Sequence, residues 1–178
     1  MGVSNQTEKE QARVRMRWMI RDDMPQVLQA EQLSFQFAWT EEEFLRFLRQ
    51  RNCICMVAIH GERVVGFMLY ELHKNKLHLF KFAVHPAWRR IGVGSQMATK
   101  LISKLSSHRR TRITLEVRET NLSAQLFFRQ QEFRAIKVLP KFYEDSGEDA
   151  FLMEYCYGET IDELLDENGE NRIAQYEY

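Results

Sequence analysis

The feature that most constrains the fold is a turn between a strand-like segment and a helix-like segment. Apolar residues alternate from Leu77 to Val84, and the chain then passes through Arg89-Arg90-Ile91-Gly92-Val93-Gly94-Ser95 into a helical pattern. Glycines at a helix start let a ligand approach backbone N–H groups that have no partner within the helix. Such groups, with two arginines beside them, favour the binding of a phosphate. Residues 89–95 are therefore predicted to cradle a pyrophosphate.

The spacing of the turn excludes two common phosphate-binding motifs. A P-loop requires Gly-x-x-x-x-Gly-Lys-Ser/Thr, which the chain lacks. A dinucleotide fingerprint requires a third glycine, but position 97 is Met. The remaining alternative is a helix start that uses glycine only for close packing.

Downstream segments carry a resemblance to a known family. The turn, Leu115-Glu116-Val117-Arg118 and Asn121 together resemble the GCN5-related N-acetyltransferase (GNAT) family, and within it the RimI-type alanine N-acetyltransferases of ribosomal proteins. The likeness runs from about Val14 to Tyr155 and includes Phe37-Ala38-Trp39-Thr40-Glu41 and Glu148-Asp149-Ala150. It implies a single α/β (α+β) domain whose mixed, mostly antiparallel sheet is flanked by helices. In that fold the strands ending at Val84 and Arg118 form a splayed parallel pair that holds the cofactor.

Hydrophobic periodicity and capping residues predict the individual elements. Asp22-Asp23-Met24-Pro25 is typical of a helix start, and Thr40 with Glu43 forms a capping box. Residues 53–72 read as a hairpin. The remaining predicted elements are strands at 77–84, 112–118, 133–139 and 150–157, and helices at 92–107 and 121–131.

Composition bounds the organisation of the chain and its setting. With 178 residues, one domain is expected, over residues 13–157. A polar, flexible segment is expected before it at 1–12. The tail that follows, at 158–178, has seven acidic residues and one basic residue, Arg172. Zero net charge argues against a general nucleic-acid binder. Three cysteines without a metal-ligand spacing predict neither disulfides nor a metal site, and Cys53 and Cys55 are expected to be buried thiols. The chain shows no membrane-spanning run and no signal peptide, so a cytoplasmic protein is expected.

The resemblance implies acetyl-CoA as the cofactor and coenzyme A as a product. The backbone of Phe82, Ala83 and Val84 would pair with the pantetheine arm, and the N–H of Val84 would stabilise the oxyanion. Arg89 to Ser95 would hold the pyrophosphate, unless the two arginines are only a solvated helix cap. Asn121 would contact the cofactor, with helix capping as the alternative or an additional role.

The predicted general base is Glu116, which interrupts an otherwise apolar strand. A carboxylate in such a strand costs free energy unless it is solvated or paired. The alternative is therefore an ion pair with Arg118 or Arg112. In RimI-type enzymes the matching glutamate is assigned as the proton acceptor, and the resemblance favours that role here.

The chain departs from the family at the group that would protonate the leaving thiolate. The family's usual tyrosine corresponds to Phe128, which has no proton to donate. Tyr143 could supply a hydroxyl, although Phe142 and Tyr143 lie where family members grip the peptide backbone in a loop between the last strands. Plain packing is a third alternative for these two rings. Phe37 and Trp39 would line the peptide entrance or belong to the core. His73, His78 and His85 are expected to be strand or surface histidines.

These residues predict an enzyme that moves the acetyl group of acetyl-CoA to a primary amine. The favoured acceptor is the N-terminal α-amine of a protein or peptide, as in the RimI-type enzymes. A lysine side chain, a small-molecule amine, and a non-catalytic module that binds acetyl-CoA are the alternatives.

Overall fold

The computed structural model describes residues 12–158, so nearly all of the predicted N-terminal segment and acidic tail lie outside the described residues. Within this range the chain forms two compact units. The first comprises residues 12–69 and 81–100, and the second comprises residues 70–80 and 101–158. Two strands and one helix run from one unit into the other.

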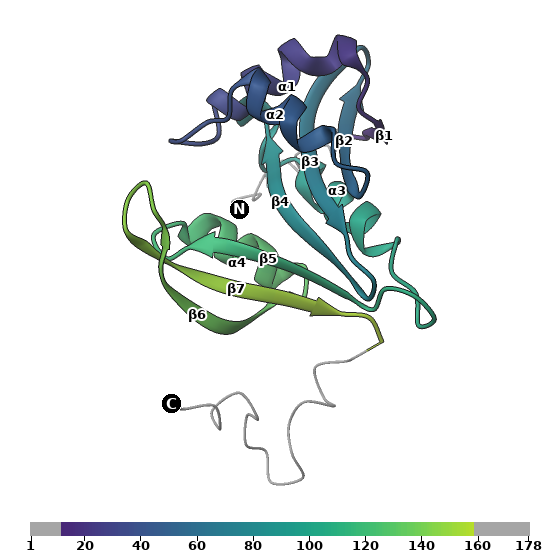
Figure 1. Ribbon diagram of the computed structural model, residues 1–178. Coiled ribbons are helices and arrows are strands. Elements are labelled where there is room, and N and C mark those ends of the chain that lie inside the picture. Colours follow the sequence, from purple (N-terminus) through teal and green to yellow (C-terminus); the bar gives the residue numbers. More distant parts are fainter. Residues whose placement is uncertain (1–11, 159–178) are drawn as a thin grey trace, which may run out of the picture. The chain divides into compact units, whose positions relative to one another are not determined.

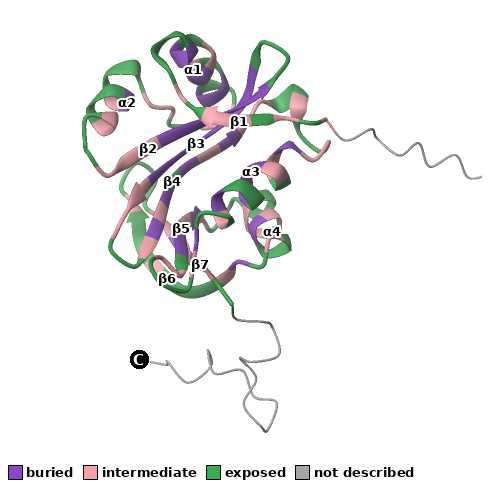
Figure 2. Cartoon of the chain, turned by 90° about the vertical axis from the view of Figure 1, so that its right-hand side faces the viewer, coloured by how far each residue is buried: buried purple, intermediate pink, exposed green. Residues whose placement is uncertain are grey.

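Two helices of the first unit cover one face of its strands (Figures 1 and 2). Helices α1 (Met24–Gln32) and α2 (Glu41–Leu48) pack on β2 (Cys53–His60) and on the first-unit parts of β3 (Arg63–Leu72) and β4 (Lys76–Val84). A short strand, β1 (Arg15–Trp18), pairs antiparallel with β2. The buried cluster between helices and strands consists of Met24, Val27, Ala30, Phe44, Cys55, Val57, Ile59, Val64, Phe67, Leu69 and Ala83.

Local sequence explains where these two helices begin. Thr40 Oγ1 accepts a hydrogen bond from Glu43 N at 3.3 Å, and Glu43 Oε2 accepts one from Thr40 N at 2.7 Å, which confirms the predicted capping box. Pro25 lies in the first turn of α1, after a 3₁₀ turn at Arg21–Asp23. Cys55 is buried, which raises the pKa of its thiol to about 12, whereas Cys53 is only half-buried.

The residues of α3 (Val93–Ile102) that belong to the first unit pack against the opposite face of its strands (Figure 2). A Cβ placed on Gly66 of β3 would lie 2.8 Å from Met97 Sδ and 2.8 Å from the Ala83 carbonyl oxygen. Because neighbouring strand residues point to opposite faces, Gly66 and Phe67 look to different sides of the sheet. Glycine at this position lets α3 come close to the strand backbone.

The second unit is built on three further strands and a helix. Strand β5 (Arg112–Arg118) pairs antiparallel with β7 (Glu148–Cys156) over its whole length, and β7 pairs antiparallel with β6 (Arg134–Tyr143). The helix α4 (Leu122–Gln130) connects β5 to β6. Lys76–His78 of β4 pair in parallel with Arg112–Thr114 of β5.

The described strands form one hydrogen-bonded sheet in the order β1-β2-β3-β4-β5-β7-β6. One parallel pair, β4 with β5, stands beside the antiparallel pairs β1–β2, β5–β7 and β6–β7. The predicted α/β class and mixed, mostly antiparallel sheet are therefore confirmed. No helix within residues 12–158 is long and apolar enough to cross a membrane.

Three element boundaries differ from the sequence-based expectation by two residues or more. Helix α3 ends at Ile102, not near residue 107, because Lys104 N and Leu105 N bond to carbonyls three residues earlier and tighten the chain into a turn. Strand β6 continues through Pro140 to Tyr143, so Phe142 and Tyr143 belong to a strand end and not to a loop. Strand β7 begins two residues before the predicted start, at Glu148.

Candidate functional site

The predicted phosphate turn lies in the first unit and adopts an unusual backbone conformation. After a 3₁₀ turn at Pro86–Trp88, Arg90 has φ +66° and Gly92 has φ +83°, and α3 begins at Val93. The left-handed region costs glycine little, whereas a non-glycine residue such as Arg90 is uncommon there. Two left-handed residues in three positions reverse the chain tightly before the helix, whose first N–H groups have no partner within it.

Arg89 is anchored to protein atoms beside this turn. Its Nε donates to the Val84 carbonyl at 2.9 Å, and its NH2 donates to Ser34 Oγ at 3.0 Å. The guanidinium thus ties the end of β4 to the segment that follows α1. Arg89 therefore stabilises the backbone that leads into the turn, and Arg90 is exposed beside it.

The end of β4 presents alternating side chains. Ala83 is buried in the cluster beneath α1 and α2, while Phe82 and Val84 on the other face are half-buried. The N–H of His85 donates to the Val65 carbonyl at 2.9 Å, which holds the strand end against β3. Phe82, Ala83 and Val84 therefore form a fixed strand end that leads into the turn.

The two aromatic residues predicted at the peptide entrance have different surroundings. Trp39 packs against Phe44 and Phe47 of α2, with ring centroids 5.5 Å away in each case, so it contributes to packing. Phe37 is 42% exposed. Lys81 Nζ lies 4.6 Å from the Trp39 ring centroid and 4.3 Å from that of Phe35.

In the second unit, Glu116 is paired with a histidine. Its Oε2 lies 3.1 Å from His78 Nε2, and His78 Nδ1 lies 3.0 Å from Thr114 Oγ1. The side chains of His78 and Glu116 are 14% and 17% exposed, so the carboxylate is sheltered but reachable. The alternative partners for Glu116 are engaged elsewhere: Arg112 faces Glu154 at 3.6 Å, and Arg118 binds other carboxylates.

His78 is the residue of this group that the sequence did not assign to the site. The β4–β5 register places it opposite Thr114, and Glu116 lies two residues further along the same face of β5. A histidine with both ring nitrogens engaged is held in one orientation. The available signal was the alternation of β4, which puts His78 on the face opposite the buried Leu77 and Leu79, but the register itself cannot be read from one sequence.

Arg118 organises the turn between β6 and β7. It donates to Asp145 Oδ2 at 2.6 Å, to Glu148 Oε2 at 2.7 Å and to Ser146 Oγ at 2.7 Å. Its guanidinium carbon also lies 3.8 Å from the centroid of the Tyr143 ring. These contacts connect the end of β5, which carries Glu116, to the aromatic residue at the end of β6.

The phenol of Tyr143 is half-buried and has a raised pKa. Burial raises the pKa of its phenol to about 12; the nearby Arg118 lowers it, and the charges of Glu116, Glu148 and Asp145 raise it. A phenol with this pKa is a weaker acid than a thiol, whose ordinary value is about 8.5. Phe142, its neighbour, is 44% exposed.

The last two predicted cofactor residues serve structural roles in the second unit. Asn121 caps α4, because its Oδ1 accepts from Ala124 N at 3.1 Å and from Ser123 Oγ at 3.0 Å. Phe128 is 6% exposed and packs edge-on against Phe127 and Phe133, with ring centroids 5.1 and 5.3 Å away. Capping and a cofactor contact are compatible for Asn121.

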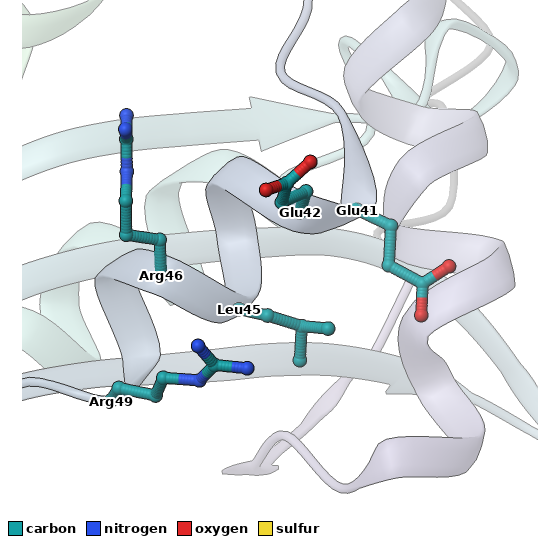
Figure 3. A pocket seen from close by; sticks show the side chains of 5 residues that line it. All are labelled: Glu41, Glu42, Leu45, Arg46 and Arg49. Carbon is teal, nitrogen blue, oxygen red and sulfur yellow. The ribbon is translucent and has the colours of Figure 1, made fainter.

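A surface hollow on α2 contains none of the predicted site residues. It is lined by Glu41, Glu42, Leu45 and Arg46 of α2 and by Arg49, which follows the helix (Figure 3). In residues 12–158, no group of three or more His, Cys, Asp or Glu side chains is arranged to hold a metal ion.

Residues 24–133 match the model of the acetyltransferase (GNAT) family. An uncharacterized N-acetyltransferase of Methanocaldococcus jannaschii is 37% identical over 103 residues, which are 57% of this chain and 65% of that protein. The [ribosomal protein bS18]-alanine N-acetyltransferase of Escherichia coli K12 is 26% identical, over 74% of this chain and 89% of its own. An N-alpha-acetyltransferase of Saccharolobus solfataricus is 27% identical, over 74% and 86% of the two chains.

A solved structure extends the match to the fold. The crystal structure of Ard1 from Thermoplasma volcanium aligns with a TM-score of 0.74 at 27% identity, covering 82% of this chain and 99% of that one.

Proposed function

Because the chain belongs to the acetyltransferase (GNAT) family and is an acetyl-CoA-dependent N-acetyltransferase, we propose that its acceptor is the N-terminal α-amine of a protein or peptide. The observation that carries the proposal is the Glu116–His78 pair, a sheltered carboxylate whose partner is a histidine and not a permanent cation. A carboxylate at this place is a group of the kind that serves as a general base. Relatives named for alanine N-acetylation of a ribosomal protein and for N-alpha-acetylation support the α-amine.

The acidity of amines also favours this acceptor. An α-amine has a pKa of about 7.7–8.0, so roughly one molecule in five to ten is neutral at pH 7. A lysine amine, at about 10.4, is neutral in roughly one molecule of 2,500, a handicap of about 4.6 kcal/mol. One carboxylate acting as base is adequate for the first more easily than for the second.

The proposed reaction proceeds by direct attack. The neutral amine forms a C–N bond to the thioester carbonyl carbon, and Glu116 accepts the proton that the nitrogen loses, directly or through a water. The N–H of Val84 stabilises the oxyanion. The C–S bond then breaks and coenzyme A leaves as a thiolate, whose thiol pKa of about 8.5 makes departure without an acid tolerable.

We assign the remaining predicted residues to binding. Arg89, Arg90 and the backbone of Ile91, Gly92, Val93, Gly94 and Ser95 would hold the pyrophosphate, with Phe82–Val84 along the pantetheine arm and Asn121 and Phe128 as further cofactor contacts. Phe142 and Tyr143 would grip the peptide, with Phe37 and Trp39 at its entrance. The 42% and 44% exposure of Phe37 and Phe142 leaves their rings available for such contacts.

A peptide panel tests the acceptor. Thiol release from acetyl-CoA is measured with short peptides that have a free N-terminus, and again with the terminus blocked and a lysine left open. We expect turnover only with free N-termini, including ribosomal-protein starts. Turnover with the blocked, lysine-bearing peptides would show that the acceptor is a lysine side chain. Turnover only with small amines would reject a protein acceptor.

The base is tested separately with Glu116→Gln. We expect turnover to fall at least tenfold while the Kd for acetyl-CoA stays within twofold. Glu119→Gln, an exposed carboxylate just beyond the same strand, is the matched control and should keep full activity. Unchanged turnover in Glu116→Gln would reject the assignment of the base.

A further inference from the structure

A short strap of the N-terminal chain lies against the phosphate turn in the first unit. Ala12 N donates to the Ile91 carbonyl at 3.1 Å. Gln96, in the first turns of α3, donates from Nε2 to the Ala12 carbonyl at 2.6 Å and accepts at Oε1 from Val14 N at 3.1 Å. The side-chain amide of Gln96 therefore bridges both ends of the strap formed by Ala12–Val14.

The same contacts occupy the carbonyl groups of the turn. The Ile91 carbonyl accepts from the strap, and the Gly92 carbonyl accepts from Gln96 Nε2 at 3.2 Å and from Gln96 N at 3.2 Å. An anion cradle needs its N–H groups directed at the ligand and its carbonyls directed away. Fixing both carbonyls on protein donors holds these two peptide groups in one orientation without help from a bound ligand.

Glutamine suits this place because the bridge needs a donor and an acceptor on one side chain. The amide supplies both, whereas a glutamate has no donor and a methionine of similar size offers neither to a useful degree. Gln96 is half-buried, so its hydrogen bonds are partly protected from competition by water. None of the predicted cofactor residues makes this bridge.

We propose that Gln96 and the Ala12–Val14 strap are positioning elements that preorganise the turn for the pyrophosphate of acetyl-CoA. The inference rests on the proposed placement of the pyrophosphate at residues 89–95. It adds a role to a segment that precedes β1 and that takes no part in the chemistry. Preorganisation improves affinity by removing the cost of ordering the loop on binding.

The test compares two acetyl donors that differ in the pyrophosphate. Acetyl-CoA and S-acetylpantetheine share the thioester and the pantetheine arm, but only acetyl-CoA has the pyrophosphate and nucleotide. In Gln96→Met we expect the KM for acetyl-CoA to rise about tenfold with kcat within twofold, and kcat/KM for S-acetylpantetheine to stay within twofold. Thr99→Met, an exposed site on the same helix, is the matched control and should change neither donor.

A second variant tests the strap without touching the helix. Ala12→Pro removes the N–H that bonds to the Ile91 carbonyl, and Ala12→Gly keeps it. We expect the proline variant alone to show the same selective rise in KM for acetyl-CoA. It also keeps the proposal testable if Gln96→Met does not fold.

The outcomes that overturn the proposal separate it from the site on which it rests. If both variants retain the wild-type preference for acetyl-CoA, or lose activity equally with both donors, the strap does not position the pyrophosphate. If the wild-type enzyme itself shows no preference for acetyl-CoA over S-acetylpantetheine, the placement of the pyrophosphate at the turn is wrong as well.

Discussion

Lys81 Nζ lies 2.6 Å from Glu31 Oε1, and the two side chains, 10% and 0% exposed, form a buried ion pair in the first unit. Glu31 Oε1 also accepts from Trp39 N at 2.8 Å, so the pair connects β4 to the segment between α1 and α2. Among the described residues, Glu31 Oε2 makes no hydrogen bond. The buried carboxylate has lost its hydration, and only Lys81 and one backbone N–H compensate for that loss among the described residues.

Removing the lysine should be strongly destabilising. Breaking a buried pair from one side typically costs about 3–5 kcal/mol, because the remaining charge has no partner. We expect Lys81→Met to lower the free energy of unfolding in urea by an amount in this range. Lys81→Met combined with Glu31→Gln should recover part of the loss, since the amide oxygen can still accept from Trp39 N.

An exposed lysine provides the control for this measurement. Lys137→Met, on β6, should change the free energy of unfolding by less than about 0.5 kcal/mol. Equal effects of Lys81→Met and Lys137→Met would show that the buried pair contributes nothing particular to stability.

Local patterns in the sequence were sufficient for much of the fold. The alternation of residues 77–84, the Thr40–Glu43 capping box and the glycine turn each depend on neighbours in the chain, and the structure has each of them where expected. The end of α3 was wrong because a helical pattern can continue past the last helical hydrogen bond. Strand β6 was too short in the prediction, because the strand continues through Pro140, and proline is compatible with an edge strand.

Contacts between distant residues could not be predicted. Glu116 was recognised as anomalous within its strand, but its partner depends on the β4–β5 register, which a single sequence does not contain. Lys81 lies on the buried face of β4, with Leu79 and Ala83, and only the packing of α1 reveals Glu31 beside it. Arg118 was considered as a partner for Glu116, and its actual partners, Asp145 and Glu148, come from a turn about 30 residues away.

Arg118 should make stability sensitive to acid. Its hydrogen bond lowers the pKa of Asp145, while Thr120 and then Arg118 lower that of Glu148. Carboxylates with depressed pKa values stabilise the fold above their unfolded pKa values of about 3.9 and 4.3, and this contribution is lost as the pH falls through the folded values. We expect Arg118→Met to be less stable than wild type at pH 7 and to approach it at pH 3, measured by urea unfolding.

The exposed Arg129 of α4 gives the comparison for this effect. The free energy of unfolding of Arg129→Met should equal that of wild type at every pH between 3 and 7. A gap between Arg118→Met and wild type that stays constant down to pH 3 would mean that these carboxylates do not contribute through ionisation.

Tyr143 should act through its ring and not through its proton. Protonation of the thiolate by a phenol of pKa about 12 would be unfavourable by about 3.5 pKa units, or about 5 kcal/mol. We expect Tyr143→Phe to keep kcat within about threefold, because the stack on Arg118 remains, and Tyr143→Ala to raise the KM for peptide about tenfold. A tenfold fall of kcat in Tyr143→Phe, with KM unchanged, would instead identify an acid.

The raised pKa of Tyr143 also predicts how the free energy of unfolding changes at alkaline pH. Because the folded state raises the phenol pKa above its ordinary value of about 10, the neutral form stabilises the fold below pH 10. This contribution is lost as the pH rises through about 12. The free energy of unfolding should therefore fall more steeply between pH 10 and 12 in wild type than in Tyr143→Phe, and parallel curves would contradict the assignment.

His78 should support Glu116 without binding the cofactor. His78→Phe keeps a ring beside Phe80, whose centroid lies 4.5 Å away, but removes the hydrogen bonds to Glu116 and Thr114. If Glu116 is the base, as proposed, it loses orientation without this partner, so we expect kcat to fall about three- to tenfold while the Kd for acetyl-CoA stays within twofold. Thr114→Val, which removes only the contact to His78 Nδ1, should cause a smaller fall in the same direction. Full kcat in His78→Phe would show that the pair is only a packing contact, because the ring volume is retained and the link to the carboxylate is not.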